Sequence, residues 1–165
     1  MRRPASTGLH ALLAACGGFL VAVLWFDLMF DVQVRGHSGT APLPDAVVAS
    51  IAAYYRRVTT DAHPMQALVA GVMGVALAGT AWQMRYASHR PLRWAALATS
   101  VAPIGLAAAR VLPNAVRLGA QVGSPAELSA LARSIFADHT LCLASIVVFT
   151  GVHVVLGRAA TPGRY

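Results

Sequence analysis

Four long apolar stretches dominate the pattern of hydrophobic and polar residues along the chain. They cover residues 9–31, 64–84, 91–112 and 139–157, and each approaches or exceeds the roughly 20 apolar residues that cross a bilayer. The second, third and fourth stretches hold no acidic residue, lysine or arginine except near their edges. The pattern therefore predicts an integral membrane four-helix bundle, with residues 1–165 forming a single transmembrane domain.

The segments between these stretches predict two further helices outside the membrane. Ser124, Pro125 and Glu127 form a capping-box sequence with proline at the first helical position, so we expect one helix to run from there to Gly157. Its outer part, residues 125–138, carries one apolar face, and so does the segment 45–58. We expect these two amphipathic helices to pack together as an extramembrane helical cap, which makes the fold class all-α.

Composition and charge agree with a membrane protein. The chain is 57% hydrophobic and 12% charged, and its mean hydropathy is +0.61. The net charge is +7, yet the basic residues, all arginines, lie at the ends of apolar stretches without interleaved exposed aromatics, which argues against a nucleic-acid partner. The arginine, alanine, valine and leucine usage is typical of a GC-rich bacterial genome, so we expect the bacterial plasma membrane.

The arginines also bear on orientation. One side of the predicted membrane carries seven of them and the other carries six, which favours cytoplasmic placement of both termini. The seven are Arg2, Arg3, Arg85, Arg90, Arg93, Arg158 and Arg164.

Two acids lie where apolar residues are expected. Asp27 and Asp31 are four residues apart, so they share one face near the outer end of the first span. An acid within a span usually faces the bundle interior and has a partner. We expect polar side chains of other segments to converge at the same depth, namely His63, Gln66, Arg110, Asn114, Asp138 and His139.

Three interpretations of this polar level stay open. In the first, Asp27 or Asp31 pairs with Arg110 or Arg56 and only fixes the helix register. In the second, the carboxylates of Asp27 and Asp31 bind iron, manganese, copper or zinc together with one or two imidazoles. The metal ligands would be Asp27, Asp31, His63 and His139. In the third, a cofactor-free pocket uses His139 as a general base that an aspartate orients.

A haem site is a further alternative. His139 and His153 are fourteen residues apart, which places them on nearly the same helix face and separates them by about 21 Å. At the matching depths in the membrane, His63 would lie opposite His139 and His10 opposite His153, as the second haem ligands. Such a pair of sites would suit a membrane electron-transfer protein.

At several positions the sequence resembles the anthrone oxygenase-like family of small membrane proteins. The resemblance covers most of residues 11–157 and is carried by Pro113, Asn114 and Leu118 at the end of the third span, and by Phe136 and His139 at the entry to the fourth. It implies four spans, an outer cap and oxidation of polycyclic aromatic anthrones to quinones by molecular oxygen, with no evident cofactor.

The resemblance also implies that Asn114 and His139 line the active pocket. We add Asp27 from its place in the first span, and so expect His139, Asn114 and Asp27 to be the catalytic residues, with Arg110 and Asp138 as structural support. The chain departs from the family in having Asn114 directly after Pro113, Cys142 where an arginine is usual, and the two acids in its first span.

A non-catalytic role as an accessory subunit of a larger membrane complex, or as a homo-oligomer, is the alternative. Ala70, Gly74 and Ala78 form a ridge of small residues of the kind that lets helices approach closely. The two hypotheses differ in where Asp27 and His139 point. They would face each other in a site for a small hydrophobic substrate, and would face outward in a subunit contact.

Overall fold

The structure, a computed structural model, describes residues 5–37, 39, 41–86 and 88–160, and these residues contain helices and no strand. The elements in chain order are α1 (Ala5–Asp31), the 3₁₀ helix η1 (Val32–Gly36), α2 (Asp45–Arg56), the π-helical turn η2 (Arg57–Asp61), α3 (His63–Gln83), α4 (Arg90–Leu106), the π-helical turn η3 (Ala107–Val111), α5 (Leu112–Gly119) and α6 (Pro125–Ala160).

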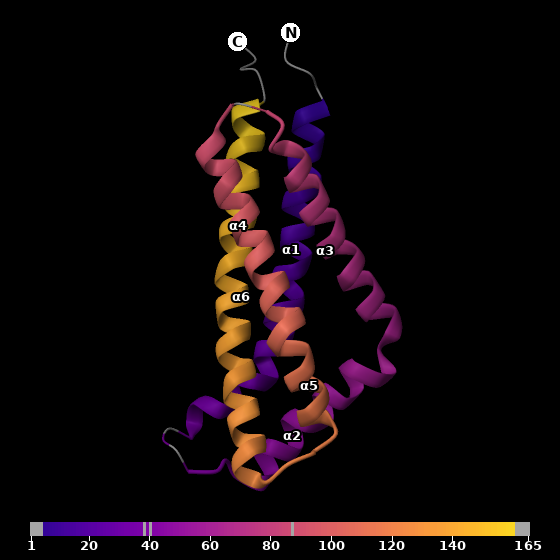
Figure 1. Cartoon of the computed structure of the whole chain (residues 1–165), viewed down its shortest axis with the longest axis vertical. Coiled ribbons are helices and arrows are strands. Elements are labelled where there is room, and N and C mark those ends of the chain that lie inside the picture. The colour runs from indigo at the N-terminus through magenta and orange to yellow at the C-terminus, as the bar shows by residue number, and fades with distance from the viewer. Residues whose placement is uncertain (1–4, 38, 40, 87, 161–165) are drawn as a thin grey trace.

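Four helices are long and apolar enough to cross a membrane, as the sequence predicts. They cover Thr7–Gly36, His63–Gln83, Arg90–Gly119 and Pro125–Ala160. α1 begins, α3 ends, α4 begins and α6 ends at one end of the bundle, while α2 and α5 lie at the other (Figure 1). The third of these helices continues past residue 112, because η3 joins α4 to α5 without a break.

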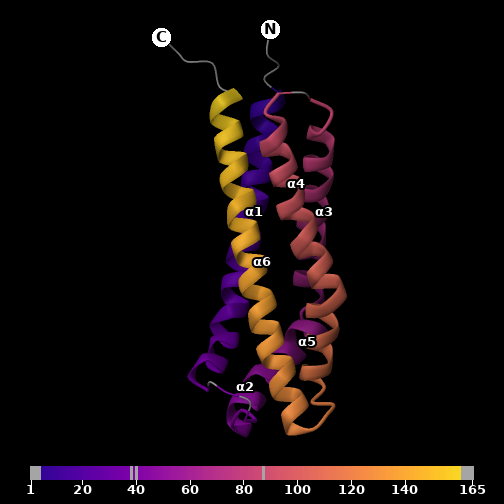
Figure 2. The same cartoon turned by 60° about the vertical axis from the view of Figure 1, so that its left-hand side comes forward.

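α6 is a single helix of 36 residues, about 54 Å long at 1.5 Å per residue. The expected capping box is confirmed, since the Ser124 backbone N–H donates to the Glu127 carboxylate at 2.7 Å and the Glu127 N–H donates to Ser124 Oγ at 3.3 Å. α1 lies along α6 (Figure 2). Gly17 permits this approach, because a methyl group there would overlap Thr150 Oγ1.

The expected packing of the two amphipathic helices is also confirmed, and η1 and α5 join them in this cap. α2, η1, α5 and the first turns of α6 share a core of buried side chains. Its members are Val34, Leu43, Val48, Ile51, Ala52, Tyr55, Ala115, Leu118, Leu128, Leu131, Ala132 and Ile135. α5 contacts α2 so closely that a Cβ on Gly119 would lie 2.8 Å from the Arg56 backbone nitrogen.

The small-residue ridge does not pack within this chain. Ala70, Gly74 and Ala78 are exposed on α3, and no atom lies within 4 Å of a Cβ built on Gly74. The ridge pattern indicates that a close approach is possible, but it does not say which helix makes it.

The helix ends that the orientation prediction groups together do lie at one end of the bundle. Arg93 binds there across the α3–α4 turn, donating to the carbonyl oxygens of Gln83 and Ser88. Arg2, Arg3 and Arg164 lie outside the described residues.

Candidate functional site

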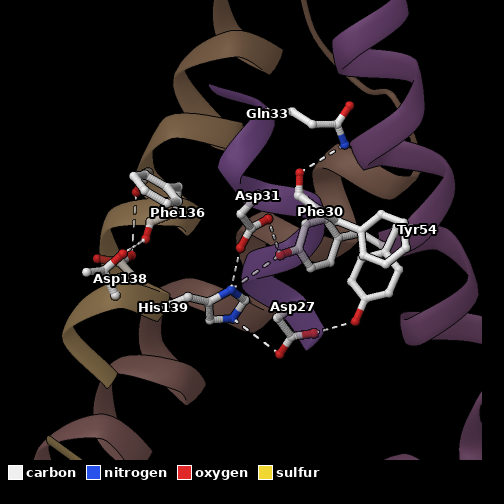
Figure 3. A network of polar contacts seen from close by, with 11 residues as sticks. Asp27, Phe30, Asp31, Gln33, Tyr54, Phe136, Asp138 and His139 are labelled. Atoms are coloured by element: carbon white, nitrogen blue, oxygen red, sulfur yellow. Dashed lines mark hydrogen bonds and ion pairs between the residues drawn. The ribbon is translucent and has the colours of Figure 1, made fainter. Parts of the chain in front are cut away.

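Asp27 and Asp31 face the histidine of α6 (Figure 3). His139 Nδ1 lies 2.7 Å from Asp31 Oδ2, and His139 Nε2 lies 3.9 Å from Asp27 Oδ2. Asp31 is fully buried and His139 is 5% exposed. The i and i+4 spacing on α1 places one carboxylate at each nitrogen of the same imidazole.

Two tyrosines of α2 complete this cluster. The Tyr55 hydroxyl donates to Asp31 Oδ1 at 2.6 Å and lies 3.3 Å from His139 Nδ1. The Tyr54 hydroxyl donates to Asp27 Oδ1 at 2.5 Å, and its ring stacks on Phe30 with 4.0 Å between centroids. The cap therefore reaches into the site and holds both carboxylates.

Neither tyrosine is among the site residues predicted from the sequence. A signal existed: Tyr55 lies on the apolar face of α2, and the hydroxyl of a buried tyrosine needs a hydrogen-bond partner. Burial and then the neighbouring Asp31 raise the pKa of Tyr55 far above its usual value, and burial with Asp27 does the same for the pKa of Tyr54. Both hydroxyls therefore remain protonated donors at neutral pH.

The hydrogen bonds fix the tautomer of a neutral His139. A carboxylate oxygen only accepts, so His139 Nδ1 carries the proton that Asp31 binds. The lone pair of Nε2 is then left to face Asp27 across a gap too long for a hydrogen bond. An imidazole oriented in this way by a carboxylate is arranged as a general base.

Asp27 and His139 line a cavity of about 140 Å³ between the four long helices. The other lining residues are Leu20, Val23, Leu24, Val69, Met73, Pro103, Ile104, Ala107, Cys142 and Ile146. Its walls are therefore apolar except at the end where Asp27 and His139 lie. A cavity of this size resembles the apolar cavity of about 150 Å³ that takes up benzene in an engineered protein.

Pro103 shapes one wall of this cavity. It lies inside α4 without a backbone N–H to donate, and the helix widens into the π-helical turn η3 four residues later. The Cys142 thiol contacts the Pro103 carbonyl at 3.8 Å. Cys142 thus occupies a packing position on the cavity wall.

The expected ion pair of Asp27 or Asp31 with an arginine is wrong. Arg110 instead pairs with Asp138, 3.3 Å from Nε to Oδ2, and also donates to Ser134. Arg56 is exposed and forms no ion pair among the described residues. The helix period explains this outcome, because Asp138 and His139 are about 100° apart on α6 and face different neighbours.

His63 and Asn114 are not brought to the cluster. His63 is exposed at the start of α3, and Asn114 is half-buried on α5 and does not line the cavity. The described residues contain no group of three or more His, Cys, Asp or Glu side chains that could hold a metal ion. The four expected metal ligands are therefore not assembled, and His139 directs both nitrogens toward carboxylates.

The paired haem ligands are not arranged as expected either. His10 and His153 contact each other directly, with their Nδ1 atoms 3.2 Å apart, and Gln83 donates to His10 Nδ1 at 3.2 Å. This contact leaves no space for a haem between the rings. His63, which would face His139, is exposed at the start of α3.

Comparison with known protein families, curated proteins and solved structures finds no match for this chain.

Proposed function

We propose that this chain is a multi-pass protein of the bacterial plasma membrane with both termini on the cytoplasmic side. The surface of the long helices supports insertion. Within the most apolar part of each, at most 28% of the residues are buried inside the chain, so most side chains there are at least partly exposed. Water would disfavour such a surface, whereas lipid accommodates it.

We further propose that the cavity holds a small hydrophobic molecule from which His139 removes a proton. The observation that carries this proposal is that Asp31 binds one nitrogen of His139, that the other nitrogen faces Asp27, and that His139 and Asp27 both line an apolar cavity. Asp27, which Tyr54 holds, faces the same space and is placed to take up the positive charge that develops on the imidazole.

Oxidation by molecular oxygen is the reaction class we propose, in line with the anthrone oxygenase-like resemblance. Removal of a proton from an acidic CH₂ group leaves a carbanion that O₂ oxidises to a hydroperoxide. Loss of water then gives the carbonyl, so CH₂ and O₂ become C=O and H₂O. No metal or other cofactor is needed in this scheme. The cavity volume favours a substrate that presents a single ring to His139.

The test is oxygen consumption by the purified chain in mild detergent, supplied with an anthrone. Replacing His139 by Gln should lower the rate by about 10²–10⁴-fold, the usual contribution of a general base. His63→Gln is the matched control, because it removes an exposed imidazole from the capped half of the bundle. Equal rates for the His139→Gln variant and the unchanged chain, after subtraction of spontaneous oxidation, would contradict the proposal.

The second candidate function is a non-catalytic subunit of a membrane complex. The exposed ridge of Ala70, Gly74 and Ala78 on α3 favours it, because it offers a surface on which another helix can pack closely. Asp27 and His139 face each other (Figure 3), and both line the cavity, which favours the catalytic proposal.

A further inference from the structure

A second hollow lies on the opposite side of α1 from the candidate site. It is a groove of about 520 Å³ between α1, η1 and α6. Trp25, Leu28, Met29 and Val32 line it from α1, and Phe136 and Thr140 line it from α6. Trp25 is 61% exposed and Met29 is 57% exposed, so this chain leaves the groove uncovered.

One cation lies at the end of this apolar groove. Arg35 of η1 lines it and is exposed. Its guanidinium makes no hydrogen bond, ion pair or ring contact with the residues that the structure describes, whereas Arg93, Arg110 and Arg133 all bind within the chain. The groove therefore combines an apolar wall with an available charge at one end.

The dimensions suit one leaflet of a bilayer. Arg35 follows Trp25 by ten positions in the chain, which corresponds to about 15 Å along a helix. The hydrocarbon core is about 30 Å thick, so one leaflet contributes about half of it. In the inserted state proposed above, Arg35 lies just beyond the end of α1, so its guanidinium would reach headgroup depth while Trp25 would lie among the acyl chains.

From this geometry we propose that the groove binds an anionic phospholipid, with its phosphate on Arg35 and an acyl chain against Trp25, Met29 and Phe136. A guanidinium matches a phosphate monoanion in charge and hydrogen-bonding geometry. A zwitterionic headgroup is bound less well, because its own ammonium offsets the attraction. The inference rests on the proposed membrane insertion.

The experiment uses the full chain with Trp82→Phe and Trp94→Phe, so that Trp25 is the sole indole. The protein is reconstituted into phosphatidylcholine vesicles that contain a minor fraction of either phosphatidylglycerol or phosphatidylcholine with brominated acyl chains, which quench tryptophan fluorescence on contact. The brominated anionic lipid should be enriched at Trp25 by about fivefold over the zwitterionic one, the factor expected for one basic side chain near anionic headgroups.

Arg35→Gln should remove this preference, and the matched variant Arg57→Gln, which removes another exposed arginine at the same end of the bundle, should keep it. Equal quenching by the two lipids, or a preference that survives Arg35→Gln, would overturn the lipid site while leaving insertion intact. Absence of quenching by both lipids would show that Trp25 does not face lipid. That outcome would overturn the groove proposal, and if single-indole chains retaining Trp82 or Trp94 were also unquenched, it would count against insertion.

Discussion

At the scale of single residues, Asp31 is held in place by both burial and hydrogen bonds. It is a fully buried carboxylate, and it is tolerated because Tyr55 and His139 both donate to it. Burial of a charge without such partners is strongly unfavourable. The same two bonds that stabilise the acid also set the orientation and tautomer of the imidazole, so stability and chemistry depend on one side chain.

Replacing Asp31 by Asn should therefore change the tautomer of His139. The amide of the variant offers an N–H as well as an oxygen, so His139 Nδ1 need no longer carry the proton. In ¹⁵N NMR spectra of histidine-labelled protein, we expect the unchanged chain to show a protonated Nδ1 and a bare Nε2, and the variant to lose that state. Identical imidazole spectra in the two proteins would contradict the assigned tautomer.

Tyr55 gives a pH-dependent prediction. Burial and Asp31 raise the pKa of Tyr55 in the folded chain. The hydrogen bond from Tyr55 to Asp31 therefore contributes its full stability at any pH below the pKa of an unfolded-chain tyrosine, about 10. This contribution is lost as the pH rises above that pKa. Tyr55→Phe should lower the free energy of unfolding by about 1.5–3 kcal/mol at neutral pH, the usual worth of a hydrogen bond to a charged group.

The same variant should weaken the loss of stability in strong alkali. Thermal unfolding in mild detergent, followed at neutral and alkaline pH, checks both effects. Tyr86→Phe is the control, since the exposed Tyr86 hydroxyl makes no hydrogen bond within the described residues. A Tyr55→Phe variant as stable as this control would show that the bond to Asp31 contributes little.

At the scale of helices, the contact of α1 with α6 sets the position of the site, because Asp31 and His139 come from these two elements. Small residues permit the contact. Gly17 is buried against Thr150 and Phe149, whereas its neighbour Gly18 is exposed with nothing within 4 Å of an added Cβ.

These adjacent glycines form a matched pair of variants. Gly17→Ala should destabilise the chain by about 1–3 kcal/mol, because the added methyl group forces the helices apart. Gly18→Ala should be neutral or stabilising, because alanine is the better helix former. Unfolding in mixed detergent measures both, and equal stabilities would mean that α1 and α6 are not packed this closely.

The helices were predictable from sequence because their signals are local. Apolar length marked the four long helices, and the capping residues marked the start of α6. It was less predictable which face of each helix packs against the rest of the protein. Lipid and protein interior are both apolar, so the pattern on α3 did not reveal that Ala70 and Gly74 face outward.

The candidate site shows the same division. The i and i+4 spacing correctly placed Asp27 and Asp31 on one face, and depth correctly suggested His139 as a neighbour. Depth alone could not separate Asp138 from His139, and it said nothing of Tyr54 and Tyr55, which reach the site from an element outside the spans.

At the scale of the whole molecule, the buried aspartates and histidines lie at two levels near opposite ends of the bundle. One level contains Asp31 and His139, and the other contains His10, His153 and Gln83. The core between them contains Leu13, Cys16, Ala76, Ala96 and Phe149. Polar groups near both ends and an apolar middle are what a chain needs to keep a fixed depth in a bilayer.

This arrangement makes orientation the last testable property, and α6 provides the probe because it runs the full length of the bundle. Ala126 and Ala159 are exposed near its two ends, so cysteine at either position disturbs no packing. The native Cys16 and Cys142 are buried and are replaced by alanine in both variants. A membrane-impermeant maleimide applied to intact cells should label Ala126→Cys and leave Ala159→Cys unlabelled, whereas after lysis both should react. The reverse pattern would invert the orientation that the arginine distribution favours, and labelling of both positions in intact cells would contradict insertion itself.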